Sequence, residues 1–276
     1  MPIQTINNVA LHYEERGDRS KPCLVLAGPL LFGAQGFDPL VPLLENDFYL
    51  VHLDVHGHGR SGLRVPLILE DMAEDFRELL LRLGLPKPVW VGHSIGGMLG
   101  MRIAHKYPDL LAALILIAAT ARPDPPALRE QTWQLWQAFR ARQRATIVEP
   151  ALPFFFARAT FREQSELIRQ YRDWIVNFPD AENVFQSALA VFNRTDITEF
   201  LPRIVAPTLV IAGSEDPAAP AAELQVIAER IPHARLMVIE QASHLVTLEK
   251  PREVAAGLRT FLQPRKLSAH ETATRR

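Results

Sequence analysis

The sequence predicts an α/β fold, with a mostly parallel central sheet, helices on both faces and an inserted helical lid. Three observations support this. Strand and helix patterns alternate at both ends of the chain. A serine flanked by glycines lies between an apolar run and a helical pattern, in Gly92-His93-Ser94-Ile95-Gly96. The segment 121–203 is rich in aromatic residues and has no strand pattern. Repeated strand–helix units with buried strands pack as a parallel sheet that is covered on both faces.

The opening of the chain reads as strands followed by a helix. Val9–Glu14 alternates between apolar and polar residues, whereas Cys23–Ala27 and Tyr49–Leu53 are continuous apolar runs, so all three are predicted strands. In Glu70–Leu83 apolar residues recur at steps of three and four, which predicts a helix that Gly84 can end.

The same alternation continues around and beyond the serine. A strand over 88–91 precedes Gly92, and a helix follows the serine as far as Tyr107, where Pro108 ends it. The remaining predicted elements are a strand over Ala113–Ala118, a strand over Pro207–Ala212, a helix over Ala221–Ile231, a strand over Arg235–Glu240 and a helix over Pro251–Leu262.

These patterns divide the chain into a core of residues 1–120 and 204–264, a lid of residues 121–203 and a tail of residues 265–276. The tail is polar and without pattern, so we expect it to be disordered. Most lid aromatics are expected to pack within the lid itself, and a minority to face a cleft and make it apolar.

The composition excludes several classes of protein. The chain has 276 residues, enough for one large core with an inserted lobe, and its net charge of −1 gives no reason to expect a nucleic-acid or membrane partner. The single cysteine, Cys23, lies in an apolar run and is expected to be a buried hydrophobic residue. No secretory signal is visible in the first 17 residues, and the longest apolar run, Leu110–Ala119, is too short to span a bilayer. We therefore expect a cytoplasmic protein, a monomer or homodimer, whose partner is a small-molecule substrate.

Ser94 is the leading candidate for a covalent nucleophile. A strand that turns sharply into a helix holds the residue between them in a strained conformation and exposes its side chain. The structural alternative is a glycine-rich turn without chemistry. A serine hydroxyl also needs a base, and the base needs an orienting acid.

The chain supplies these partners in the order acid, then histidine. Asp216 follows the strand that ends near Ala212, and His244 follows the strand that ends near Glu240. Both are therefore expected at the carboxyl edge of the sheet, beside Ser94. We predict Ser94, Asp216 and His244 as a catalytic triad. Glu215 is expected to point elsewhere, and Asp196 is the alternative acid.

An oxyanion hole requires two backbone N–H groups. One is expected from Ile95, directly after the nucleophile. The other should come from the loop Gly28-Pro29-Leu30-Leu31, where Pro29 has no N–H, so Leu30 is the first candidate and Leu31 the second. The residues expected to contact the substrate are Leu31, His93, Trp133, Trp136 and Phe155.

These motifs resemble the α/β-hydrolase superfamily, in its lidded esterase- and enol-lactonase-like branch. The resemblance also rests on Asp54-Val55-His56-Gly57-His58-Gly59-Arg60-Ser61, which is similar to the family's D-x-R-G-H-G-x-S loop. Gly28-Pro29 stands where His-Gly would fall if Phe37 holds the family's aromatic position, and enol-lactonase-like members also depart there. The resemblance implies the fold, the triad and activity without a cofactor, but no particular substrate.

The sequence therefore predicts a serine hydrolase that cleaves a carboxylic ester or lactone of a small to medium, largely apolar substrate through an acyl-enzyme. Carbon–carbon hydrolases and peroxidase-like members of the same fold remain alternatives, as does a slow protein that senses a ligand. A metal hydrolase that uses the alternating Asp54, His56 and His58 is a further alternative. Because no further cluster completes such a site, we predict no metal.

Overall fold

The computed structural model describes residues 2–85, 87–179 and 181–263. Its centre is an eight-stranded sheet in the order β1-β2-β4-β3-β5-β6-β7-β8. Strand β2 is antiparallel to its neighbours β1 and β4, and all other pairs are parallel. The strands are β1 (Ile3–Ile6), β2 (Val9–Arg16), β3 (Cys23–Ala27), β4 (Tyr49–Leu53), β5 (Val89–His93), β6 (Ala113–Ile117), β7 (Thr208–Gly213) and β8 (Arg235–Ile239).

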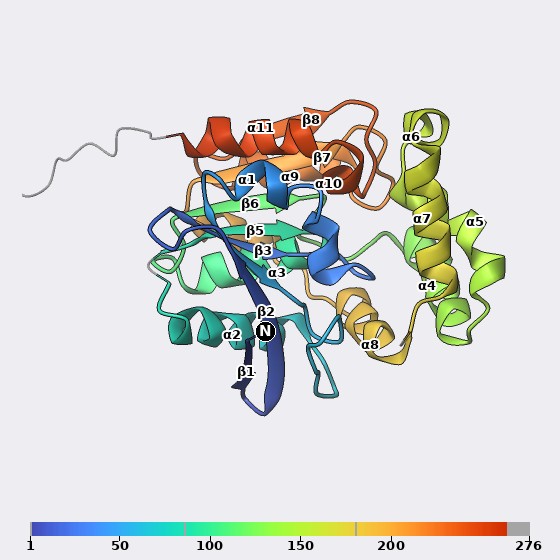
Figure 1. Ribbon diagram of the computed structural model, residues 1–276, viewed down its shortest axis with the longest axis horizontal. Helices are drawn as coiled ribbons and strands as arrows, with labels where there is room; N and C mark the ends of the chain where they lie inside the picture. Colours follow the sequence, from blue (N-terminus) through green and yellow to red (C-terminus); the bar gives the residue numbers. More distant parts are fainter. Residues whose placement is uncertain (1, 86, 180, 264–276) are drawn as a thin grey trace, which may run out of the picture.

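Helices cover both faces of this sheet (Figure 1). On one face α1 packs against α11, and on the other α2 packs against α3, which in turn contacts η2 and, through it, α9. The fold class predicted from the sequence is therefore confirmed. The helices around the sheet are η1 (Gly33–Phe37), α1 (Val41–Leu44), α2 (Leu69–Arg82), α3 (Ile95–Lys106), η2 (Thr198–Arg203), α9 (Ala221–Arg230), α10 (Val246–Glu249) and α11 (Pro251–Leu262).

The chain between β6 and η2 contains five helices and, over its described residues, no strand. Figure 1 shows α4 to α7 gathered beside the sheet and α8 next to them. Their apolar side chains form a second core, separate from the core of the sheet, in which Leu31 and Leu245 also take part. The helices are α4 (Pro126–Arg140), α5 (Arg144–Phe155), α6 (Arg158–Glu163), α7 (Ser165–Val176) and α8 (Ala181–Phe192).

The predicted strands and helices are all present, with ends that shift by at most two residues. Strand β1 was not predicted, because this short strand at the exposed edge of the sheet has no clear apolar alternation. Cys23 is half-buried against the core, and burial raises the pKa of its thiol to about 12, so the thiol stays protonated. None of the described helices is long and apolar enough to cross a membrane. The expectation for residues 265–276 concerns a segment outside the described residues.

Candidate active site

Ser94 occupies the turn between β5 and α3 with φ of 53° and ψ of −115°. A positive φ combined with this ψ is strained for a residue with a side chain, and it persists because the surroundings leave no room to relax. A Cβ on Gly96 would lie 2.0 Å from the carbonyl oxygen of Ala27, and one on Gly92 would lie 2.2 Å from that of Gly96. The two flanking glycines are therefore required for the tight turn that presents Ser94.

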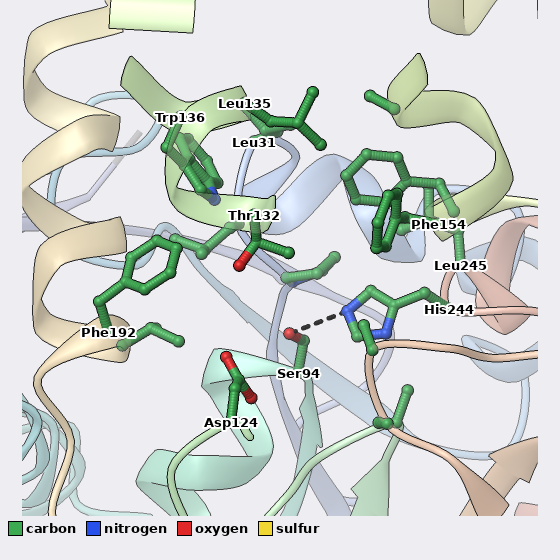
Figure 2. A pocket seen from close by; sticks show the side chains of 18 of the residues that line it. Leu31, Ser94, Asp124, Thr132, Leu135, Trp136, Phe154, Phe192, His244 and Leu245 are labelled. Carbon is green, nitrogen blue, oxygen red and sulfur yellow. Dashed lines mark hydrogen bonds between the residues drawn. The ribbon is translucent and has the colours of Figure 1, made fainter. Parts of the chain in front are cut away.

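The structure brings Ser94, His244 and Asp216 into one hydrogen-bonded chain. Nε2 of His244 lies 3.1 Å from Oγ of Ser94, and Nδ1 of His244 lies 2.9 Å from Oδ2 of Asp216. Figure 2 shows the contact of Ser94 with His244 at the floor of a cavity. Burial lowers the pKa of His244, but the carboxylates of Asp216, Asp124 and Glu249 outweigh it, so the pKa is raised above its ordinary value.

The loop after β7 holds Asp216 in position. Its Oδ1 accepts the backbone N–H groups of Ala218 at 2.8 Å and of Ala219 at 3.0 Å, which leaves Oδ2 for the histidine. The two other acids are engaged elsewhere. Glu215 accepts the N–H of Arg158, and Asp196 accepts the N–H of Thr198. The geometry therefore favours Asp216 as the partner of His244.

The loop after β3 leaves Leu30 as the better of the two candidate oxyanion donors. The N–H of Leu31 is already used, because it donates to Nε2 of His58 at 3.0 Å. Leu30 lies half-buried in the wall of the cavity that also contains Ser94. Ile95 opens α3 directly after Ser94, where the N–H groups of a helix have no partner within the helix.

The alternating residues 54, 56 and 58 form a scaffold for these loops. His58 is fully buried; its Nδ1–H donates to the carbonyl of His56, so its Nε2 is free to accept from Leu31. Burial lowers the pKa of His58, which keeps this ring neutral. His56 pairs with the buried Asp75 at 2.9 Å, and Asp54 pairs with His12. The three side chains thus have separate partners, and over the described residues no cluster of three metal-binding side chains occurs.

An apolar cavity lies between Ser94 and the helices above it (Figure 2). Leu31, Trp136 and Phe155 line it, as expected from the sequence. Its other large apolar lining residues include Leu30, Met98, Leu135, Phe139, Ile147, Phe154, Ile175, Val191, Phe192 and Leu245.

Two residues expected in this cavity lie elsewhere. Trp133 does not line it; its ring packs against Phe185 and Phe192, because it projects from the side of α4 that faces α8. His93 is completely buried behind the histidine loop. The structure therefore does not place these two predicted substrate-binding residues in the lining of the cavity.

Comparisons with known proteins agree with this geometry. Residues 26–251 match the family model described as the alpha/beta hydrolase fold. The chain belongs to the alpha/beta hydrolase fold family. It is 30% identical, over 85% of its length and 89% of the relative's, to "Putative carbamate hydrolase RutD" of Stutzerimonas stutzeri.

Two solved structures of this family are also similar to the chain. One is a thermophilic esterase from Thermogutta terrifontis, with 31% identity and a TM-score of 0.85, covering 95% of this chain and 97% of the esterase. The other is the enol-lactonase from Burkholderia xenovorans LB400, with 26% identity and a TM-score of 0.86, covering 95% and 100% of the two chains.

In this alpha/beta hydrolase, His93 supports the histidine loop through two hydrogen bonds. Its Nε2–H donates to the carbonyl of His244 at 2.7 Å, and its Nδ1 accepts the hydroxyl of Thr247 at 3.1 Å. Burial, with His244 nearby, lowers the pKa of His93 to about 3. The ring is therefore neutral near neutral pH, and its Nε2–H holds the backbone carbonyl of His244 in place.

Sequence analysis also missed Glu249, which joins the histidine loop to the helices over the cavity. Its carboxylate accepts the N–H of Ser243 at 2.6 Å and the N–H of Ala157 at 2.7 Å, together with the hydroxyl of Thr160. Burial raises the pKa of Glu249 and these hydrogen bonds lower it, with a net value above the ordinary one. In the sequence Glu249 is only an acidic residue shortly before the predicted helix at Pro251, and no motif around it indicates a structural role.

A second missed group is the ion pair of Arg194 with Asp124 at one end of the cavity. The side chain of Arg194 is 1% exposed and that of Asp124 is 18% exposed. A buried arginine requires an acidic or polar partner. Asp124 and Arg194 are seventy positions apart in the chain, so the sequence gives no local pattern that predicts this ion pair.

Proposed function

We propose that this protein is a serine esterase or lactonase that acts through an acyl-enzyme on a small to medium, largely apolar substrate. The observation that carries the proposal is the chain of hydrogen bonds from Ser94 through His244 to Asp216, open to an apolar cavity. The family and its esterase and enol-lactonase neighbours indicate a hydrolase of ester-type bonds.

The proposed reaction begins when Oγ of Ser94 attacks the carbonyl carbon of the bound ester. Nε2 of His244 accepts the hydroxyl proton as the new C–O bond forms, and Asp216 stabilises the resulting imidazolium. The N–H groups of Leu30 and Ile95 are the proposed donors to the oxyanion. Each such donor contributes a factor of about 100 to 1,000 in turnover.

His244 then returns its proton to the leaving oxygen, the C–O bond of the ester breaks, and an acyl group remains on Ser94. A water molecule repeats the sequence with His244 as the base, which frees the acid and restores the serine. Every proton in the cycle passes through Nε2 of His244, so the chain's own residues account for the reaction. We propose the helices of 121–203 as the lid that encloses the acyl or alcohol chain.

The test is a panel of short p-nitrophenyl esters and lactones, followed in a pH-stat, with wild type, Ser94→Ala and the control Ser165→Ala. Ser165 is an exposed serine at the start of α7, so its variant should retain wild-type activity. Ser94→Ala should lose at least about a thousandfold in kcat, with an unchanged melting temperature. Turnover by Ser94→Ala at the wild-type rate would refute the proposal, and tight ligand binding without turnover by wild type would indicate a ligand sensor.

A further inference from the structure

One end of the otherwise apolar cavity is polar. Thr120, Asp124, Thr132 and Arg194 contribute to its lining, beside the nucleophile. In Figure 2 the carboxylate of Asp124 and the hydroxyl oxygen of Thr132 lie on the same side of the cavity as each other, across from His244. Burial of a polar group costs free energy unless the group forms hydrogen bonds. The hydrogen bonds that each of these side chains makes within the protein therefore show which donors and acceptors remain for a ligand.

The guanidinium of Arg194 has no donor left for a ligand. An arginine has five N–H groups. In Arg194, Nε donates to the carbonyl of Arg122 at 3.0 Å and Nη1 donates to the carbonyl of Val191 at 2.8 Å and to Asp124 at 3.4 Å. Nη2 donates to the hydroxyl of Thr120 at 3.2 Å and to the second oxygen of Asp124. All five are therefore committed within the protein.

Asp124 and Thr132 keep acceptor capacity on the cavity side. A carboxylate has about four acceptor positions, and Arg194 fills one on each oxygen of Asp124. The hydroxyl proton of Thr132 is shared between the carbonyls of Leu128 at 2.8 Å and Arg129 at 3.2 Å, within its own helix. Its oxygen can then only accept from a ligand. At this end of the cavity Asp124 and Thr132 thus offer acceptors to a ligand, and the guanidinium of Arg194 offers no donor.

We propose that the acceptors of Asp124 and Thr132 bind a neutral hydrogen-bond donor of the substrate, a hydroxyl or an amide N–H. This inference rests on the proposed function, and it narrows the substrate class to esters or lactones that carry such a donor. The paired charges of Asp124 and Arg194 cancel, so the site has no net attraction for a cation. A substrate with a free carboxylate is disfavoured, because it would meet the carboxylate of Asp124 with no arginine N–H to receive it.

The test compares esters of matched shape that differ in one group. 2-Hydroxyethyl butanoate is paired with propyl butanoate, and ethyl 3-hydroxybutanoate with ethyl 3-methylbutanoate, which places the donor on the alcohol side or the acyl side. Monoethyl succinate is paired with ethyl 4-methylpentanoate to test an anion. Wild type should prefer the donor ester by about tenfold or more in kcat/KM in at least one pair, since hydrogen bonds to charged groups are worth this much. It should discriminate against the succinate.

Two variants locate the preference. Asp124→Asn and Thr132→Val should each lower the ratio of kcat/KM for the donor ester to kcat/KM for its matched apolar ester. Glu223→Gln and Thr146→Val are the matched controls: Glu223 pairs with Arg122 on the surface, and the hydroxyl of the exposed Thr146 donates to its own helix start. Their donor preference should equal that of wild type.

The inference is overturned if wild type cleaves both members of each donor pair at rates within about twofold, if the succinate is preferred, or if the preference survives in both variants. If Asp124→Asn does not fold, Thr132→Val decides alone. Failure of the proposed function gives a different result: either no ester is cleaved, and both proposals fall, or cleavage persists in Ser94→Ala. Cleavage that depends on Ser94 but shows no donor preference removes this inference only.

Discussion

Removal of the Glu249 carboxylate should both destabilise the fold and slow catalysis. In Glu249→Ala the N–H groups of Ala157 and Ser243, which are 1% and 0% exposed, lose their acceptor. A buried donor without a partner costs about 1–3 kcal/mol. Two such donors amount to about 2–6 kcal/mol, and relief from burying the carboxylate offsets part of it, so we expect a loss of about 3 kcal/mol.

Urea unfolding, analysed for its midpoint and its slope, measures this loss directly. Glu249→Gln should lie between wild type and Glu249→Ala, because the amide keeps one acceptor oxygen. The matched control is Glu163→Ala, which removes an exposed glutamate from α6 and should change stability by less than about 0.5 kcal/mol. Ser243 directly precedes His244, so loss of its hydrogen bond should also disturb the catalytic histidine. We therefore expect kcat for a p-nitrophenyl ester to be lower in Glu249→Ala even at urea concentrations at which the variant is still folded.

The reasoning is refuted if Glu249→Ala unfolds at the same urea concentration as Glu163→Ala. It is also refuted if the two variants turn over the ester equally, since the carboxylate would then hold neither the histidine loop nor the helices above it.

Three further predictions concern the histidines and the absence of a metal. The activity should fall as the pH drops through the pKa of His244, because only the neutral ring accepts the proton of Ser94. In a pH profile of kcat/KM the midpoint of this fall should lie above 6.5, the ordinary pKa of histidine. A midpoint below that value would contradict the raised pKa. His93→Phe should lower kcat with little change in KM, since it removes the hydrogen bond to the His244 carbonyl; steady-state kinetics with an altered KM alone would argue against a positioning role. Dialysis against EDTA should leave turnover unchanged, and a loss restored by added zinc would reveal a metal-dependent step.

The sheet and the three hydrogen-bonded residues were predictable because local signals mark them. Buried strands such as Cys23–Ala27 are short apolar runs, and Ser94 and Asp216 each follow one of them. His244 follows β8, an edge strand that is only partly buried but is also apolar in sequence. The carboxyl ends of parallel strands share an edge, so the chain order alone brings these residues together.

The lining of the cavity was less predictable, because it depends on which side of each helix faces inward. Trp133 and Trp136 lie one turn apart in α4, yet only Trp136 reaches the cavity. The spacing of residues along α4 does not show which side of the helix faces the cavity. That depends on how α8 and the loop containing Leu31 pack against it. Long-range partners such as Asp124 and Arg194 leave no local pattern at all.

The most direct test of the account is to identify the covalent intermediate. Wild-type protein is quenched with acid during turnover of p-nitrophenyl butanoate, digested and analysed by mass spectrometry. The account predicts a butanoyl group on the side chain of Ser94, absent in Ser94→Ala. A butanoyl group on another residue, together with undiminished turnover by Ser94→Ala, would contradict it.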